Sequence, residues 1–295
     1  MSTSESPLHL VVKTPVDLIA VAHVCLGFVP EESLVITAVG GRQFHCRLDI
    51  PPPSRRTADL EDLARLARGH HADAITAVIF SKFRPGAAGL ATAVCEAFGA
   101  AGIEVFQVVF ADGERWSLPL FRDSVPQPYD VSIHPIVLDA LLAGFSVLES
   151  RAALAKRVAP DPKLRAAVAA VLCEAASTAQ LPTPLDEAQG STHGATSARQ
   201  IAAAILDCED EGPNEWGVRS SEEQGGLDWW CTVTRGAPLG RAAEPAARAA
   251  LLAWRAGNGA LAWCAVDRCL AEEPDHGLGR TVALLLESAT APPPR

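Results

Sequence analysis

Four charged residues in the N-terminal half have types and positions that suit ligand binding: Arg47, Asp49, Lys82 and Arg84. Arg47 and Asp49 are two residues apart in an alternating segment, so they share one face of a predicted strand. Lys82 and Arg84 follow the apolar run Ala74 to Phe80, at the end of a strand, where open α/β sheets tend to bind ligands. With the amino end of the next helix, these two cations could hold an anion. Convergence of all four side chains would form a pocket at the strand ends.

Each pair also has an interpretation that involves no ligand. Arg47 and Asp49 can form an ion pair on a solvated face of the sheet, which would contribute little to stability. The loop after the apolar run contains Gly86 and Gly89, and their spacing matches neither a Walker loop nor a dinucleotide-binding fingerprint. The sequence therefore leaves a structural ion pair beside a solvated loop as the alternative to a binding pocket.

Histidines and acids are the remaining candidates for chemistry. His23 lies in a predicted helix without a second titratable group at helical spacing, so a structural histidine is favoured over a catalytic one. The adjacent His70 and His71 point in different directions, which indicates a solvated loop rather than a metal-ligand pair. The acidic stretch at about 207–226 lacks the spacing of a calcium-binding loop. We therefore predict no metal site and no cofactor, and the catalytic residues, if any, stay unknown.

The composition predicts a folded cytoplasmic protein. The chain has 295 residues, of which 48% are hydrophobic, and its formal net charge is -10. That charge argues against general binding to nucleic acids or to an anionic membrane surface. The sequence has no apolar run long enough to span a membrane and no signal-peptide pattern. Its eight cysteines form no CxxC pair, as expected of free core thiols in a reducing compartment.

The first predicted elements are a short strand and a capped helix. The strand is expected at Leu8 to Val12. Thr14, Pro15 and Asp17 are then typical of a helix start, in which the threonine and aspartate form a capping box. Gly27 is typical of the residue that ends such a helix.

Two hairpins and a β-α-β unit follow. The first hairpin joins Ser33 to Val39 and Arg42 to Ile50 at Gly40-Gly41, and should be antiparallel. A helix at about 57–68 precedes the β-α-β unit, which consists of a strand at 74–80, a helix at about 87–100 and a strand at 103–110. Such a crossover predicts a parallel pair of strands. Asp112-Gly113 should form the second hairpin with a strand at 115–121.

Beyond residue 125, alanine- and leucine-rich segments with helical periodicity replace the strands. The expected helices lie at about 136–144, 151–158, 162–178 and 198–208, with a loop at about 180–197, an acidic loop at about 207–226 and a terminal helical hairpin at about 244–290. We therefore predict an α/β domain over residues 1–125, with a mixed sheet and flanking helices, and a helical domain over residues 126–295.

Four segments carry a family resemblance: TPVDLIAVAHVCLGFVPEESLVI, RLDIPPP, EVFQVVFADGERWSL and LLAWRAGNGALAWCAVDRCLAEEPDHGLGRTVALLLE. In this order they resemble an actinobacterial family catalogued as a domain of unknown function. The last segment also resembles one tetratricopeptide-type unit, where a solenoid needs about three. The resemblance runs from about Leu8 to Glu287 and implies a shared fold, without an activity, a cofactor or a catalytic residue. The family usually has a proline where this chain has His23.

Two functions remain open. The sequence lacks a nucleophile elbow, a Walker loop and a metal-ligand cluster, which favours a non-enzymatic binding or protein-interaction module with an unknown protein partner. In that case the helical half or the face of the first hairpin would contact the partner. The alternative is a small-molecule-binding or enzymatic α/β domain, whose pocket would take a small anion or a nucleotide.

Overall fold

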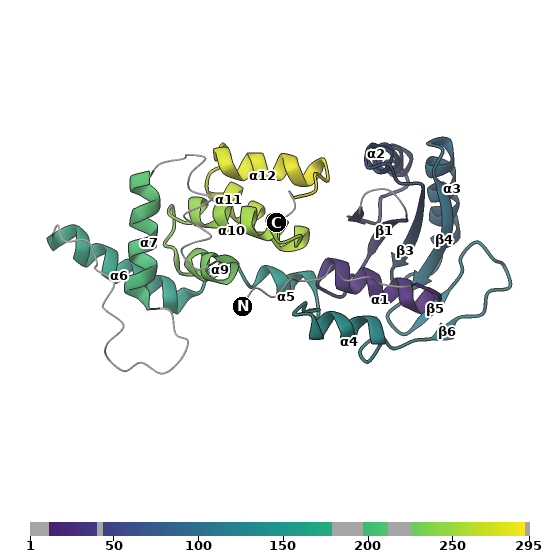
Figure 1. The fold of residues 1–295 in the computed structure, drawn as a ribbon, viewed down its shortest axis with the longest axis horizontal. Coiled ribbons are helices and arrows are strands. Elements are labelled where there is room, and N and C mark those ends of the chain that lie inside the picture. Colours follow the sequence, from purple (N-terminus) through teal and green to yellow (C-terminus); the bar gives the residue numbers. More distant parts are fainter. Residues whose placement is uncertain (1–11, 40–43, 179–196, 212–225, 293–295) are drawn as a thin grey trace, which may run out of the picture. The chain divides into compact units, whose positions relative to one another are not determined.

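The computed structural model describes residues 12–39, 44–178, 197–211 and 226–292. The chain divides into two compact units, Met1–Arg151 and Ala152–Arg295 (Figure 1). The predicted fold class is confirmed, because the first unit holds a six-stranded mixed sheet with flanking helices and the described residues of the second are helical. The sequence analysis places the domain boundary after residue 125, whereas the compact units divide after Arg151.

The sheet of the first unit has the order β2-β1-β3-β4-β5-β6. Its strands are β1 (Ser33–Val39), β2 (His45–Asp49), β3 (Ala74–Phe80), β4 (Glu104–Ala111), β5 (Arg115–Ser117) and β6 (Gln127–Pro128). β1 is antiparallel to both β2 and β3, whereas β3 and β4 are parallel, so the expected antiparallel pair and β-α-β unit are both present. The expected turn at Gly40-Gly41, and all but the last residue of the strand expected at Leu8 to Val12, lie outside the described residues.

The strand register brings several strand ends to one edge of the sheet. Ser33, the first residue of β1, pairs with Asp49 at the end of β2 and with Phe80 at the end of β3. The parallel register then places Ala111, the last residue of β4, beside Phe80. We call this the carboxyl edge, defined by Asp49, Ser33, Phe80 and Ala111.

Helices cover both faces of β3, whose seven residues are all buried. α1 (Pro15–Leu26) packs on the face that Phe80 occupies, where the His23 and Phe80 ring centroids lie 5.6 Å apart. The other face of the sheet is covered by α2 (Arg56–Gly69) and α3 (Ala87–Ala100), which pack against each other (Figure 1). α4 (Pro135–Leu142) adds an outer layer, because its buried apolar side chains pack against those of α1. This packing explains why the first unit extends past residue 125.

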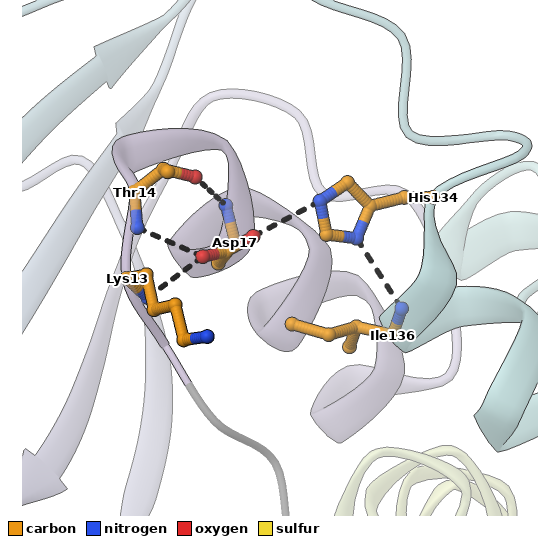
Figure 2. A network of polar contacts seen from close by, with 5 residues as sticks. All are labelled: Lys13, Thr14, Asp17, His134 and Ile136. Carbon is orange, nitrogen blue, oxygen red and sulfur yellow. Dashed lines mark hydrogen bonds and ion pairs between the residues drawn. The ribbon is translucent and has the colours of Figure 1, made fainter.

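Asp17 joins the start of α1 to the start of α4 (Figure 2). Its Oδ2 accepts the backbone N–H groups of Lys13 and Thr14 at 2.7 and 2.8 Å, and Thr14 Oγ1 accepts the Asp17 N–H at 3.2 Å, which completes the predicted capping box. Asp17 Oδ1 lies 3.1 Å from His134 Nε2, while His134 Nδ1 accepts the Ile136 N–H at 3.3 Å. Burial alone would raise the pKa of Asp17, but the hydrogen bonds from Lys13 and Thr14 outweigh it and lower that pKa.

The described helices of the second unit are α5 (Arg151–Ala155), α6 (Pro162–Thr178), α7 (Ala198–Glu211), α9 (Gly226–Gly236), α10 (Ala243–Arg255), α11 (Gly259–Glu272) and α12 (Gly277–Glu287). α10 and α11 lie where the terminal helical hairpin is expected, and they pack against each other. α7 continues three residues beyond its expected end at residue 208, and the acidic stretch at 212–225 lies outside the described residues.

A buried polar cluster joins α9, α10 and α12 in the second unit. The Arg248 side chain is 3% exposed, donates to Glu244 Oε1 at 2.8 Å, and lies over the Trp230 ring at 5.0 Å from its centroid. The other oxygen of Glu244 lies 3.0 Å from His276 Nε2, and His276 Nδ1 accepts the Gly279 N–H at the start of α12. A buried charge is tolerated where it is paired in this way, so we assign this cluster a structural role.

Replacing Asp17 with alanine should destabilise the first unit, because two backbone N–H groups and the His134 ring lose their shared acceptor. We expect the free energy of unfolding to fall by about 2 kcal/mol, as for a lost helix cap with further hydrogen bonds. Hydrogen exchange of peptides from α1 and α4, measured by mass spectrometry, reports this loss. The matched control Asp62→Ala removes an exposed ion pair with Arg65 on α2 and should cost less than about 0.5 kcal/mol. Equal effects of the two substitutions would refute the role given to Asp17.

Candidate functional site

A small pocket opens at the carboxyl edge of the sheet, with a volume of about 70 Å³. Sites for drug-sized ligands measure roughly 300–1,000 Å³, so this pocket fits a single functional group. Its apolar lining includes Val29 and Phe80. Its polar side chains come from α1, from the two residues before β1 and from the segments after β3, β4 and β6: His23, Glu31, Glu32, Ser81, Lys82, Asp112 and Tyr129. We call it the strand-end pocket.

Glu32 organises the loop that follows β3. Its Oε2 accepts the Ser81 hydroxyl at 2.8 Å, and its Oε1 accepts the Lys82 N–H at 3.0 Å. Ser81 Oγ in turn accepts the Phe83 N–H at 3.0 Å. Glu32 has a φ angle of 41°, in the left-handed region that costs a residue with a side chain roughly 1–2 kcal/mol. Its hydrogen bonds to the loop therefore hold a strained backbone in place.

His23 contributes a buried imidazole to the strand-end pocket. The residue is 4% exposed, and within the described part of the chain its Nε2 has no hydrogen-bond partner. Burial lowers the pKa of His23 from 6.5 to about 4, so the ring is neutral at pH 7. A buried polar atom without a partner costs about 1–3 kcal/mol.

Asp112 and Tyr129 complete the polar lining. Asp112 follows β4, and its Oδ1 accepts the N–H groups of Glu114 and Arg115 at 2.9 and 2.6 Å in the turn to β5. Burial, with a contribution from the nearby Asp112 carboxylate, raises the pKa of Tyr129 to about 12, although the Gly113 N–H donates to its hydroxyl. The Tyr129 hydroxyl therefore keeps its proton at neutral pH.

Two of the predicted site residues, Arg47 and Asp49, lie at the carboxyl edge outside the strand-end pocket. Their side chains form an ion pair with an Nη2–Oδ1 distance of 2.6 Å. Arg47 Nε also donates to Ser33 Oγ at 2.9 Å, and the Ser33 hydroxyl donates to the Glu31 carbonyl. These contacts tie the end of β2 to the start of β1.

The other two predicted residues, Lys82 and Arg84, have separate positions. Lys82 lines the strand-end pocket, whereas Arg84 does not. Arg84 donates to the Ser124 carbonyl at 3.3 Å, which ties the loop after β3 to the loop after β5. These two loops expose large apolar side chains, namely Phe83 at 69%, Phe121 at 65% and Val125 at 68%. Of the four predicted site residues, Lys82 therefore lines the strand-end pocket, whereas Arg47, Asp49 and Arg84 do not.

The sequence did not mark Glu31, Glu32, Ser81, Asp112 or Tyr129 as binding residues, and His23 was expected to be structural. A signal existed for Ser81 and Asp112, because each directly follows one of two strands predicted to be parallel, and the carboxyl ends of parallel strands meet at one edge. No local pattern marks the others, which reach the pocket through tertiary packing.

The described residues offer no cluster of three or more His, Cys, Asp or Glu side chains that could hold a metal ion. Their helices also include none with the length and apolar character needed to cross a membrane. The strand-end pocket therefore has to be interpreted from its own hydrogen-bonding groups and charges.

The fold and the pocket define a two-unit protein, with a mixed α/β unit that carries a small polar pocket and a unit whose described residues are helical. The chain belongs to the family described as Domain of unknown function (DUF4192), whose model matches residues 15–216 and 216–293. The expected membership of a family of unknown function is thus confirmed. Among curated proteins and among solved structures, none matches the chain.

Because burial lowers the pKa of His23, the first unit should lose stability as the pH falls from about 6.5 to about 4. In that interval the unfolded chain binds a proton at His23 that the folded chain does not bind, so acid favours unfolding. His23→Leu removes this linkage. Relative to the wild type, the variant should gain about 2 kcal/mol in unfolding free energy between pH 7 and pH 5. Urea unfolding followed by hydrogen exchange in α1 measures this gain, and a difference that does not change with pH would contradict the buried neutral ring.

Proposed function

We propose that the protein is a non-enzymatic binding protein, whose first unit receives one functional group of its ligand in the strand-end pocket. The observation that carries this proposal is His23, a residue that lines the pocket and whose buried Nε2 has no hydrogen-bond partner within the described residues. Buried polar atoms are almost always hydrogen-bonded, so an exception beside a pocket supports a binding role. The free cysteines support a cytoplasmic location, where thiols stay reduced.

The protonation states of the pocket support binding over catalysis. A general acid or base works best when its pKa lies near the surrounding pH. Burial moves the pKa of His23 down to about 4 and that of Tyr129 up to about 12, so neither exchanges protons readily at neutral pH. Glu32 and Asp112 already accept hydrogen bonds that fix their loops. The pocket thus presents hydrogen-bonding groups of fixed charge and position.

The size of the pocket limits the ligand. About 70 Å³ suffices for one small polar group, whereas a nucleotide needs several times that volume. We therefore propose that a small molecule, or one side chain of a larger partner, enters the strand-end pocket, and we do not extend the proposal to a nucleotide.

A thermal-shift screen with one-function molecules tests this proposal. The panel holds methylammonium, acetate, phosphate, formamide and methanol, and at least one should raise the unfolding temperature with the logarithm of its concentration. His23→Leu should abolish that rise, while it stabilises the ligand-free protein by about 1 kcal/mol because the unpartnered polar atom is gone. Identical responses of wild type and variant to every compound would refute a binding role for the pocket.

A protein-interaction function is the second candidate, and the two apolar loops favour it. Phe83 and Phe121 are more than half exposed, and the bond from Arg84 to the Ser124 carbonyl holds their loops together. Large apolar side chains grouped in solvent mark contact sites for other proteins. These loops would bind a partner protein through an apolar surface of that partner. The contact would lie beside the strand-end pocket, which Lys82 lines.

Chemical cross-linking of the purified protein in host lysate tests this second candidate. Phe121→Ser should reduce capture of a specific partner at least tenfold, because exposed aromatic residues often dominate binding energy. Phe106→Ser is the matched control, since Phe106 is 58% exposed on β4, away from both loops. Both variants should keep the stability of the wild type. Equal capture by the two variants would exclude these loops as the contact site.

A further inference from the structure

Helix α4 carries apolar side chains on two sides, and α1 covers one of them. The side chains on the covered side pack in one cluster with those of α1: Ile136, Val137 and Ala140. Leu138, Leu141 and Leu142 are three and four residues apart, so they share the other side, and all three are exposed. A helix that is apolar all round is normally buried all round, so the outer side of α4 is suited to a further contact.

Two more exposed apolar side chains lie at the ends of this helix. Ile133 precedes α4 and Phe145 follows it. We call the five side chains together the α4 surface: Ile133, Leu138, Leu141, Leu142 and Phe145. At 88% exposure, Leu142 is the most exposed large apolar side chain among the described residues. Large apolar side chains that gather in this way mark an interaction site, whereas single ones need no explanation.

Both ends of α4 are fixed, so the α4 surface is formed before any partner binds. At the start of the helix, the His134 ring caps the first turn and is itself held by Asp17. At the end, Gly144 has a φ of 87°, and the Phe145 N–H beyond it donates to the Ala140 carbonyl at 2.9 Å. A preformed surface loses less conformational entropy on association than a mobile one.

The near absence of charge on this segment bears on what covers it. Asp139 is the one charged residue from Pro135 to Leu148. An uncharged surface has no electrostatic pattern that would select or orient a different protein. The lack of basic residues likewise disfavours an anionic membrane surface. Two copies of this chain each carry a net charge of -10, so they repel each other least where they meet through an uncharged surface.

We propose that two copies of this chain pair reversibly through the α4 surface, around a two-fold axis. In such a contact the same surface is used twice, and the leucine ridges of one α4 pack into the grooves of the other. The five side chains expose roughly 400 Å² per copy, so two copies would bury about 800 Å² through them alone. Specific interfaces begin at about 1,000 Å² in total, which the neighbouring exposed residues bring within reach, and the dimer is therefore weak. This pairing lies outside the strand-end pocket and goes beyond the proposed binding function.

Sedimentation velocity of the full-length protein over a concentration series tests the pairing. The wild type should shift from monomer to dimer, with a dissociation constant on the order of 10 μM. Leu142→Ser should weaken dimerisation at least tenfold, because it removes the most exposed side chain of the α4 surface. Leu284→Ser is the control, since Leu284 is 64% exposed on α12, and it should dimerise like the wild type. Both variants should keep the wild-type unfolding temperature at concentrations where the protein is monomeric.

Two charged variants, Leu142→Asp and Leu142→Lys, test the two-fold symmetry. A residue close to a two-fold axis lies near its own counterpart in the other copy. Each variant alone would then place like charges together, so each should stay monomeric. An equimolar mixture places opposite charges together and should form a heterodimer. Because the mixture gains an association that neither variant has, misfolding cannot explain this result.

Four results would overturn the pairing. A wild type that stays monomeric at every concentration has no such dimer, and a dimer that Leu142→Ser leaves unchanged uses another surface. If the mixture of charged variants stays monomeric, the two-fold contact at Leu142 is excluded. Binding of the monomeric wild type to phosphatidylcholine vesicles, lost in Leu142→Ser, would assign the α4 surface to a lipid membrane. None of these results affects the proposed function of the strand-end pocket, which is tested with ligands of that pocket.

Discussion

The register of β1 is the constraint on which the first unit depends. Because β1 is antiparallel to both neighbours, its first residue, Ser33, lies between the last residues of β2 and β3. The parallel pairing of β4 then adds a further strand end at the same edge. A slip of one residue would turn every side chain of β1 to the opposite face, and it would also withdraw Glu32 from the loop after β3. A single register thus fixes both the sheet and the strand-end pocket.

Elements with a local cause could be predicted from the sequence, whereas the pocket could not. The capping box at Thr14 and the fully apolar AITAVIF strand each follow from a few neighbouring residues, and the structure has both. β6 was missed because two residues carry no periodic pattern, and Tyr129 follows it directly. His23 reaches Phe80 through the packing of α1 on the sheet, which helical periodicity does not specify. Arg47 and Asp49 share a face as expected, and that proximity explains why they pair with each other.

Burial is the common physical cause of the pocket's properties. It keeps the His23 ring neutral and the Tyr129 hydroxyl protonated at neutral pH. In the buried cluster around Arg248 in the second unit, by contrast, Arg248, Glu244 and His276 are paired with one another. The two sites thus differ, because His23 Nε2 in the first unit has no partner within the described residues. This difference is the basis of the functional proposal, since family membership and fold assign no activity.

Position 32 imposes opposing demands on its residue. The backbone, with its φ of 41°, is best suited to glycine, whereas the loop after β3 requires a carboxylate of that length to accept from Ser81 and Lys82. Glycine would satisfy the first demand and fail the second, and a β-branched residue would fail both. Although Glu32 is exposed to solvent, position 32 should tolerate very little sequence variation. Surface accessibility alone would wrongly predict that natural variants are common there.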